Sequence, residues 1–530
     1  MRHFHSYGPV NSKAHFCVQR QALITQGIEQ LIGREENGGH YFTIWAPRQT
    51  GKTWLMRELE LHINQQYPEK FTILQFSLGK LKGISLPEKP ADFPEAFGRL
   101  IKRSLPGQAE VKNWDDFSQL FSKTDGLWDR PLILLIDEVD TIPLSLIDLM
   151  VAQFREIYLD RQNNWLHGLA LVGVRAVLGI ESKRGSPFNI QKSLRVPNLT
   201  PEEVTELYHQ YQEESGQQIV PTVVEKVYDS TQGQPGLVSW FGELLTEKYN
   251  PGMEKTLDEK TWKLVWLSAR AIEPNNTLLN IIAKAKELES QEFLITLFTN
   301  SNIPFFFHHS QHNYLYLHGI IEPELETLPN GEEHYVCRFS SPFVQQCLYD
   351  ALSQEIIGSK TPALALDPLD KLTDVFGDTF LNLPALLTRY KDYLSRLKAQ
   401  GINLWKDQPR RKTDLNLIEA VGHFYLFNWL LDAVGEDCIV SPEFPAGKGQ
   451  VDLHLLCGHQ RGIIEVKSFV KNSQIKSDQD QAANYAKDLG IDRVTVALFI
   501  PVLDETVLKT LTTIEVVNGV EVTVVAIGWV

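Results

Sequence analysis

The stretch of the chain that decides its fold lies near the N-terminus and reads YFTIWAPRQTGKTWLMRELELHINQQY, residues 41–67. Its first five residues, 41–45, are mostly aromatic or β-branched and predict a buried strand. From residue 54 onward, apolar residues recur at helical spacing. Between these two segments the loop APRQTGKT, residues 46–53, ends in glycine, lysine and threonine. The stretch therefore predicts a strand, a short loop and a helix in direct succession.

The loop has the composition of a phosphate-binding loop, with alanine where the commonest form of the pattern has its first glycine. Successive backbone N–H groups and the helix N-terminus can surround the phosphates of a nucleotide. Gly51 lets the backbone approach closely, Lys52 reaches the β- and γ-phosphate oxygens, and the Thr53 hydroxyl ligates Mg²⁺. The residues expected to contact ATP and Mg²⁺ here are Arg48, Gln49, Thr50, Gly51, Lys52 and Thr53.

Further apolar runs alternate with helical stretches after the loop. Strands are predicted at 71–77, 132–136 and 168–174. This alternation indicates a parallel α/β sheet that is covered on both faces. The run at 132–136 leads directly into Asp137 and Glu138. Asp137 is placed to hold Mg²⁺ through water, and Glu138 to orient and deprotonate an attacking water molecule.

Composition narrows the classes of protein that the chain can belong to. Its 530 residues are 43% hydrophobic and 22% charged, which argues against a disordered or repeat-only chain. The net charge of -15 means that any nucleic-acid site must be a local basic patch. The N-terminus lacks the apolar core of a signal peptide, and the longest apolar run is too short to span a membrane. We therefore expect a cytoplasmic protein with no membrane partner.

The cysteine and histidine spacings predict no metal or disulfide framework. No CxxC pair occurs among the cysteines, and Cys457 is interpreted as a small buried residue of a strand. The histidines within residues 308–312 are interpreted as an exposed turn. The five cysteines lie far apart, at Cys17, Cys337, Cys347, Cys438 and Cys457.

From residue 200 to residue 249 the pattern becomes helical. Thr200 precedes PEEVTELYHQYQEE, so that a helix begins with an N-cap threonine and a proline in its first turn. A further helix is predicted from GQPGLVSWFGELL, residues 233–245. The segments YLYLHGIIEP, residues 314–323, and HYVCRFSS, residues 334–341, could form the β-wing of a winged helix-turn-helix.

Residues 1–250 resemble the AAA-type ATPases of the STAND branch, the signal-transduction switch ATPases, and the related archaeal-type ATPases. That family carries an arginine near the adenine upstream of the phosphate loop, which implies this role for Arg20. It carries a glycine–x–proline in a helical lid, which implies that Pro235 contacts the adenine. It also has a polar sensor after the fourth strand, for which Arg175 is the candidate. The resemblance further implies a homo-oligomer formed through the ATPase domain, although no arginine finger is assignable.

A second constellation lies near the C-terminus. Asp452 begins one predicted strand, and Glu465 and Lys467 alternate along the next, so that both lie on one face of it. Carboxylates can hold Mg²⁺, and a neighbouring lysine can stabilise the charge that develops during phosphodiester cleavage. A glutamate and a lysine two apart on a strand are, by themselves, more often a solvated face. Strands are predicted at 451–458, 462–469, 493–500 and 520–530, and helices at 416–432 and 478–489.

Five elements in this order resemble the PD-(D/E)XK nucleases of the RecB-like branch, with Val451 in place of the proline. The resemblance implies that the first helix supplies Glu419 to the metal ions. It also implies that Gln481 and Tyr485, which share a helix face, contact nucleic acid. This region is net acidic, so DNA must meet a local patch or bind the winged helix instead. The candidate patch is Arg410, Arg411 and Lys412.

The expected fold class is an α/β multidomain protein: a P-loop AAA-type ATPase core, a helical lid, a winged helix and a PD-(D/E)XK nuclease domain. The expected function is an ATP-hydrolysing switch that controls a Mg²⁺-dependent nuclease acting on DNA, in defence against phage or plasmids. The rival is a nucleotide-sensing scaffold whose nuclease-like domain binds nucleic acid or a protein without cleaving. The expected domains are 1–195 (ATPase core), 196–250 (lid), 251–355 (winged-helix-like), 356–405 (helical linker) and 406–530 (nuclease).

Overall fold

The computed structural model forms two compact units. One contains Met1–Ile281, Asn313–Ile321 and Phe339–Val344, and the other contains Ile282–His312, Glu322–Arg338 and Gln345–Val530. Among the described residues, no helix combines the length and apolar character needed to cross a membrane. The structure describes all residues except 34–37, 82–92, 105–110, 125–126, 175–191, 300–302, 328–331, 358–363, 368–369, 371, 378–379, 407, 409, 412–415, 436–437, 447–448, 470–471 and 530.

The first unit contains a parallel sheet with the strand order β2-β3-β4-β1-β5. The strands expected from the apolar runs are confirmed, whereas the four-residue β5 was not predicted. The elements are α1 (Gln21–Ile32), β1 (Tyr41–Trp45), α2 (Lys52–Gln66), β2 (Thr72–Ser77), α3 (Phe93–Ser104), α4 (Trp114–Gln119), β3 (Leu132–Asp137), α5 (Leu144–Leu159), β4 (Leu166–Gly173) and β5 (Lys192–Arg195).

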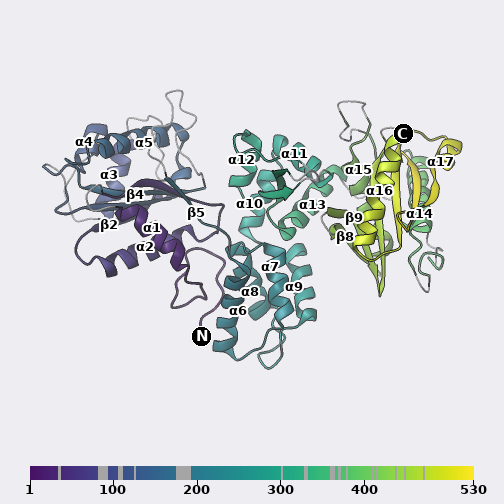
Figure 1. Ribbon diagram of the computed structural model, residues 1–530, viewed down its shortest axis with the longest axis horizontal. Helices are drawn as coiled ribbons and strands as arrows, with labels where there is room; N and C mark the ends of the chain where they lie inside the picture. The colour runs from purple at the N-terminus through teal and green to yellow at the C-terminus, as the bar shows by residue number, and fades with distance from the viewer. Residues whose placement is uncertain are drawn as a thin grey trace. The chain divides into compact units, whose positions relative to one another are not determined.

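Helices cover both faces of this sheet, as the sequence predicts. Figure 1 shows α1 and α2 on one face and α3 and α5 on the other. Alternate residues of β3 enter different cores: Ile133 and Leu135 pack with α1 and α2, whereas Leu134 and Ile136 pack with α3 and α5. Burial on both sides explains why the sequence of β3 is a continuous apolar run rather than an alternating one.

A group of helices follows the sheet in the same unit. It comprises α6 (Pro201–Ser215), α7 (Pro221–Thr231), α8 (Pro235–Glu243) and α9 (Glu259–Ala271). The predicted start of α6 is confirmed, because the Thr200 hydroxyl accepts the Glu203 N–H while the Glu203 carboxylate accepts the Thr200 N–H. This reciprocal pair satisfies two backbone donors that a helix start otherwise leaves free.

The next segment has more helix than the sequence suggested. Residues 314–317, expected in a strand, belong to helix α12, because the apolar pattern there suits either structure. Strand β6 starts only at Ile321 and pairs with β7. The elements are α10 (Asn276–Ala285), α11 (Leu288–Thr299), α12 (Ser310–Leu317), β6 (Ile321–Thr327), β7 (Glu333–Phe339) and α13 (Pro342–Ile357).

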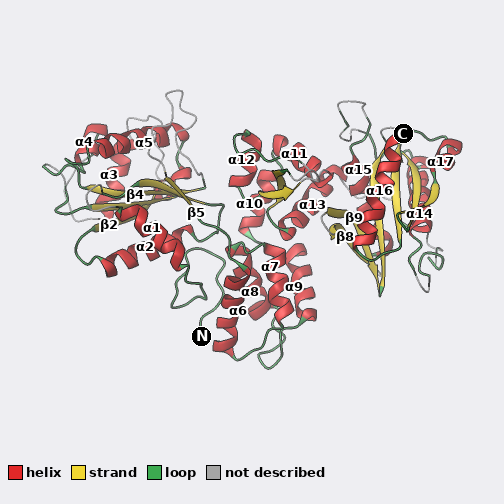
Figure 2. Cartoon of the chain, viewed as in Figure 1, coloured by secondary structure: helices red, strands yellow, loops and turns green. Residues whose placement is uncertain are grey.

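The second unit contains a mixed sheet with the order β12-β13-β11-β10-β9-β8. Figure 2 shows strands β8 and β9 of this sheet in yellow. The four predicted strands are confirmed, and β8 and β12 extend the sheet at its two edges. The pairs β10–β11 and β11–β13 are parallel, and the others are antiparallel. The elements are α14 (Leu383–Ala399), α15 (Glu419–Val434), β8 (Ile439–Ala446), β9 (Gly449–Cys457), β10 (Gln460–Ser468), α16 (Asn472–Asp488), β11 (Arg493–Ile500), α17 (Glu505–Leu511), β12 (Thr513–Val517) and β13 (Val520–Gly528).

The two faces of strand β11 pack against different groups of side chains. Val496 and Leu498 join the core that includes the α16 alanines, such as Ala483. Phe499 points the other way, and its ring centroid lies 6.4 Å from that of Tyr390 in α14. Gly422 of α15 permits this packing, because a Cβ there would lie 2.8 Å from the Phe499 ring. Helix α15 is thereby held close against the strands.

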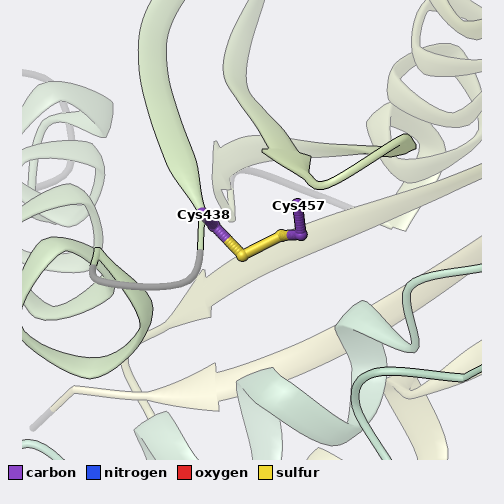
Figure 3. The surroundings of a disulfide bond; sticks show 2 residues. All are labelled: Cys438 and Cys457. Carbon is purple, nitrogen blue, oxygen red and sulfur yellow. A yellow bond between two sulfur atoms is a disulfide. The ribbon is translucent and has the colours of Figure 1, made fainter.

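The expectation of no disulfide is wrong at one position, where Cys438 is bonded to Cys457 (Figure 3). The bond follows from the β8–β9 pairing, which sets Ile439 opposite Leu456 and so brings the two adjacent cysteines together. The two cysteines lie 19 positions apart in the sequence. The link could not be predicted, because β8 itself was not recognised.

Candidate functional site

The phosphate loop joins β1 to α2. Gly51 is the N-cap of α2 and has φ 91, a left-handed backbone that glycine adopts without steric cost. The chain therefore turns sharply and α2 begins at Lys52. The Lys52 ammonium donates to the carbonyl oxygens of Ala46 at 2.8 Å and Pro47 at 2.5 Å. In this arrangement the lysine is folded back over its own loop.

The acidic pair at the end of β3 lies beside the loop. The Thr53 hydroxyl donates to Asp137 Oδ2 at 2.8 Å, and the Glu138 N–H donates to Asp137 Oδ1 at 2.8 Å. Glu138 itself has φ 56, which turns its side chain toward β2. There its carboxylate accepts the Ser77 hydroxyl and lies so close to Gly79 that a Cβ would be 2.0 Å from Oε2.

Burial shifts the pKa values of two of these groups toward their neutral forms. Burial lowers the pKa of Lys52 to about 8, although Asp140 and Asp137 oppose the change. Burial also raises the pKa of Asp137, against the hydrogen bonds from Thr53 and from the Glu138 N–H. The loop thus holds a cation with too little negative charge around it, a situation that an anionic phosphate would relieve.

A cavity of about 920 Å³ opens beside this loop. The loop residues Gln49, Thr50, Gly51, Lys52 and Thr53 line it together with the acidic pair and Pro235. The Pro235 helix is fixed to the loop, because the Gly236 N–H donates to the Gln49 carbonyl at 3.0 Å. The volume suits a nucleotide, since ligand pockets usually measure about 300–1,000 Å³.

Two of the predicted nucleotide contacts, Arg20 and Arg48, are not among the residues that line this cavity. The Arg20 guanidinium pairs with Glu203 at 3.1 Å and donates to the carbonyls of Pro197 and Asn198. Arg48 contributes its carbonyl, which accepts the Gln234 side chain at 3.1 Å. Arg175 lies outside the described residues.

Sequence reasoning missed one wall of the cavity. It is formed by His5, Ser6, Gly8, Pro9 and Val10, residues of an N-terminal segment far from the loop in sequence. Ser6 fixes this segment to α8, because its N–H and its hydroxyl donate to Glu243 at 2.6 and 2.8 Å. The segment is extended and carries no motif, so the sequence offers no signal for this placement.

In the second unit the structure brings together the four residues predicted for the C-terminal site. The Lys467 ammonium lies 3.3 Å from Glu419 Oε1, 3.5 Å from Asp452 Oδ2 and 3.5 Å from Glu465 Oε2. The Asp452 and Glu465 carboxylates therefore share one partner and cannot point to opposite faces of the sheet. Three acidic side chains surround one lysine.

Strand pairing explains this convergence. Strands β9 and β10 are antiparallel with Leu453 opposite Ile464, so Asp452 lies opposite Glu465. The Val466 N–H donates to Asp452 Oδ2 at 2.6 Å, and the Asp452 N–H donates to Glu465 Oε1 at 3.3 Å. Glu419 enters from the first turn of α15 and accepts the Ser468 N–H at 3.4 Å. Strands and helix thus fix the carboxylates from three directions.

The cluster is strongly shielded from water. Glu465 is 1% exposed and Asp452 is 8% exposed. Burial, with the neighbouring Asp452 carboxylate, raises the pKa of Glu465, and burial also raises the pKa of Glu419. Burial opposes the charge of Lys467, but the Asp452, Glu419 and Glu465 carboxylates outweigh it and raise the pKa of Lys467. The lysine is therefore charged and partly neutralises the acids.

Sequence reasoning missed two further groups behind this cluster. His423 Nε2 hydrogen-bonds the Asp452 carbonyl at 2.8 Å, and its Nδ1 hydrogen-bonds the Tyr349 hydroxyl at 2.6 Å. The side chains form a buried chain that ends at the backbone of Asp452. The available signal was the spacing, because His423 follows Glu419 by four residues and shares its helix face.

The described residues that were predicted to contact nucleic acid lie on α16 and in the segment before α15. The Gln481 side chain donates to the Tyr485 hydroxyl at 2.9 Å, and burial raises the pKa of Tyr485. In the candidate basic patch, Arg411 donates to the Phe469 carbonyl at 2.8 Å, and Arg410 lies over the Trp529 ring. Lys412 falls outside the described residues.

Comparison with known proteins places the phosphate loop within a recognised domain. Residues 5–260 match the family model described as the AAA-like domain. The curated proteins contain no match to this chain. A solved structure of a Walker-type ATPase of Pyrococcus abyssi is 13% identical to this chain and has a TM-score of 0.42. The alignment covers 64% of this chain and 98% of the chain of that ATPase.

Two other solved structures align over a similar part of the chain. The ORC1 protein of Aeropyrum pernix, in complex with DNA, has a TM-score of 0.32 and 14% identity, and covers 64% of this chain and 92% of its own. The Thermotoga maritima RuvB Holliday junction branch-migration motor has a TM-score of 0.31 and 12% identity, with coverages of 60% and 91%. The match to the AAA-like domain model covers the segment that contains the parallel sheet, the phosphate loop and the acidic pair after β3.

Proposed function

We propose that the chain is an ATP-hydrolysing switch that controls a Mg²⁺-dependent nuclease. The observation that carries the nuclease part is the group of three carboxylates around the Lys467 ammonium. The observation that carries the switch part is the loop at 46–53 beside a nucleotide-sized cavity. Each part is open to a separate test.

In the proposed ATPase reaction, Lys52 leaves the Ala46 and Pro47 carbonyls and turns to the β- and γ-phosphate oxygens. Thr53 and Asp137, already joined by a hydrogen bond, fit a Mg²⁺ site because both offer the oxygen ligands that this ion prefers. Bound there, the ion would neutralise phosphate charge. Glu138 then accepts a proton from the attacking water, and its bond from Ser77 keeps the carboxylate oriented.

In the proposed nuclease reaction, Asp452, Glu465 and Glu419 are the ligands for Mg²⁺. The donor set fits, because Mg²⁺ is bound by carboxylate oxygens and the three carboxylates already converge on the Lys467 ammonium. Bound there, the ion would polarise the scissile phosphate and lower the pKa of water. Lys467 is released from its ion pairs and stabilises negative charge on the phosphate, while the His423 bond to the Asp452 carbonyl keeps the ligand strand in place.

The alternative is a nucleotide-sensing scaffold that binds nucleic acid or a protein without cleaving. One observation favours it: Lys467 already pairs with all three acids, so part of their negative charge is neutralised without a metal ion.

Incubation of the purified protein with plasmid, linear DNA and RNA tests the proposal directly. We expect Mg²⁺-dependent cleavage by the wild type, cleavage reduced by about 10³-fold or more in Asp452→Asn, and unchanged cleavage by Asp488→Asn, whose carboxylate is exposed on α16. Nucleic-acid binding without cleavage in the wild type would instead support the scaffold. ATPase activity is measured in the same preparations, where Glu138→Gln should slow hydrolysis by about 10²–10⁴-fold.

Control of one activity by the other is tested with nucleotide. We expect ATP to change the cleavage rate or the mass in solution of the wild type, and Lys52→Ala to abolish both responses. Identical cleavage and identical mass with and without ATP would show that the two activities are uncoupled. A role in defence against phage or plasmids predicts that Asp452→Asn also removes any protection of cells that carry the wild-type gene.

A further inference from the structure

The N-terminal segment places three histidines side by side in the first unit. His3, His5 and His15 each offer a nitrogen, and these three atoms lie within 4.8 Å of one another. The ring centroids of His5 and His15 are 3.9 Å apart, and those of His3 and His15 are 4.8 Å apart. In the described part of the chain, this is the group of histidine, cysteine and acidic side chains that meets such a spacing.

Backbone pairing produces this arrangement. Residues 3 and 15 form a parallel bridge, in which the His3 N–H donates to the Ala14 carbonyl at 3.1 Å and the Phe16 N–H donates to the His3 carbonyl at 3.0 Å. Successive side chains of an extended segment point to opposite sides. His3 and His5 therefore share one side of their segment, and Phe4 occupies the other.

The apolar side of these segments anchors them to the helices. Phe4 is 1% exposed and its ring centroid lies 4.8 Å from that of Tyr208 in α6. It packs so closely on α8 that a Cβ at Gly242 would lie 2.3 Å from its ring. Phe16 is 3% exposed and packs against Phe4 at 5.2 Å. The fold thus fixes the backbone beneath the three imidazoles.

We propose that His3, His5 and His15 bind one divalent transition-metal ion, with Zn²⁺ as the chemical type. Imidazole suits this class of ion, and three histidines with a fourth position left for water is a common zinc arrangement. Zinc–nitrogen bonds of about 2.0–2.1 Å require the nitrogens to approach one another by rotation of the exposed His3 ring and the partly buried His5 and His15 rings. His15 Nδ1 now accepts the Asn11 N–H at 3.0 Å, so binding through this atom exchanges that hydrogen bond for a metal bond.

The site has a consequence for the cavity of the same unit. His5 and the residues that follow it line the cavity beside the phosphate loop. A metal ion that joins His5 to His15 would tie this wall to the bridge between residues 3 and 15. Metal binding should therefore stiffen one wall of the cavity without contacting the phosphate loop.

The test uses the full chain without a histidine tag, titrated with Co²⁺ and Zn²⁺. We expect one ion per chain, with the visible spectrum of Co²⁺ bound to nitrogen, and a higher melting temperature in Zn²⁺. His3→Gln and His15→Gln should each weaken Co²⁺ binding about tenfold or more. Substitution of residues that only hydrogen-bond a metal ligand already lowers metal affinity by about 10–100-fold. His209→Gln is the matched control, because His209 is an exposed histidine of α6 that pairs with Glu213.

Three results would overturn the assignment. One is the absence of Co²⁺ and Zn²⁺ binding by the wild type at micromolar concentrations. Another is equal binding by the wild type and by folded His3→Gln. The third is an equal loss in His209→Gln and His15→Gln. His3 is the exposed member, so its variant remains folded and informative even if His15→Gln disturbs the segment.

Discussion

Lys52 and Lys467 are both largely buried, yet their surroundings shift their pKa values in opposite directions. Lys52 donates to backbone carbonyls, and burial lowers its pKa to about 8. Lys467 is surrounded by three carboxylates, which raise its pKa despite its burial. The first lysine is short of negative charge and is suited to receive an anion. The second is surrounded by more negative charge than it neutralises, so its site is suited to receive a cation.

Asp452→Asn should have the largest effect of the substitutions in the two sites. The substitution keeps the shape of the side chain but removes one charge from the ligands, so the metal ion should no longer be held. We expect cleavage to fall by about 10³-fold or more, the equivalent of several kcal/mol of lost metal-ion stabilisation. Cleavage kinetics and calorimetric Mg²⁺ titration measure the two effects. Full metal binding by this variant would remove Asp452 from the ligand set.

Lys467→Met separates the lysine from the metal ligands. It should reduce cleavage by about 10²–10³-fold, because charge on the phosphate loses its stabilising cation. Mg²⁺ binding should be retained or strengthened, since the competing ammonium is gone. Lys487→Met, an exposed change on α16, is the control. If Lys467→Met loses cleavage and metal together, the lysine organises the acids rather than acting on substrate.

Lys52→Met is the matching change in the first unit. It should weaken ATP binding by about 10–100-fold, since hydrogen bonds to a charged group contribute about 1.5–3 kcal/mol. Fluorescent-nucleotide titration measures the loss, and Lys260→Met on α9 supplies an exposed-lysine control. Undiminished affinity in Lys52→Met would contradict the nucleotide assignment of the loop.

The two sites should respond to pH with opposite signs. Phosphate binds the protonated form of Lys52, so ATP affinity should fall, by up to about tenfold per pH unit, as pH rises above about 8. Mg²⁺ requires ionised acids, and the raised pKa values of Glu465 and Glu419 mean that binding releases protons. Metal affinity should therefore increase with pH through the neutral range. Titrations in buffers of different ionisation enthalpy detect the proton uptake and release.

The smallest effect is expected behind the carboxylates. Tyr349→Phe removes the hydroxyl that hydrogen-bonds His423 Nδ1 and leaves a buried polar atom without this partner. We expect a loss of about 1 kcal/mol in the free energy of unfolding, with cleavage little changed. Urea denaturation measures it, with Tyr335→Phe, 54% exposed, as the control. A large loss of cleavage at unchanged stability would instead give the Tyr349–His423 pair a direct role.

Local patterns in the sequence predicted the parts of the fold that local patterns determine. The buried run at 132–136 predicted β3 because both of its faces are covered, and Thr200 predicted the start of α6 because the cap is formed within four residues. Periodicity also predicted that Glu465 and Lys467 share a face. The structure places both beside Asp452, which required the β9–β10 pairing as well.

Features that depend on distant pairing could not be predicted in the same way. Cys438 and Cys457 are joined through the register of β8 and β9, and β8 has no alternating pattern that marks it. His3, His5 and His15 meet through a bridge between two short segments without a motif. Residues 314–317 were expected in a strand but belong to α12. The prediction failed because a short apolar run fits a helix or a strand equally well.

The proposed nuclease activity depends most on whether the three acids around Lys467 hold a metal ion. Crystals of the protein grown or soaked in Mn²⁺ test this directly, because the anomalous signal locates the ion. We predict one peak bonded to Asp452 and Glu465, with the Lys467 ammonium displaced from both carboxylates. The contradicting result is a crystal soaked at saturating Mn²⁺ that shows no anomalous peak at these carboxylates and in which Lys467 still contacts Glu419, Asp452 and Glu465. The cluster would then be a structural ion pair and not a nuclease site.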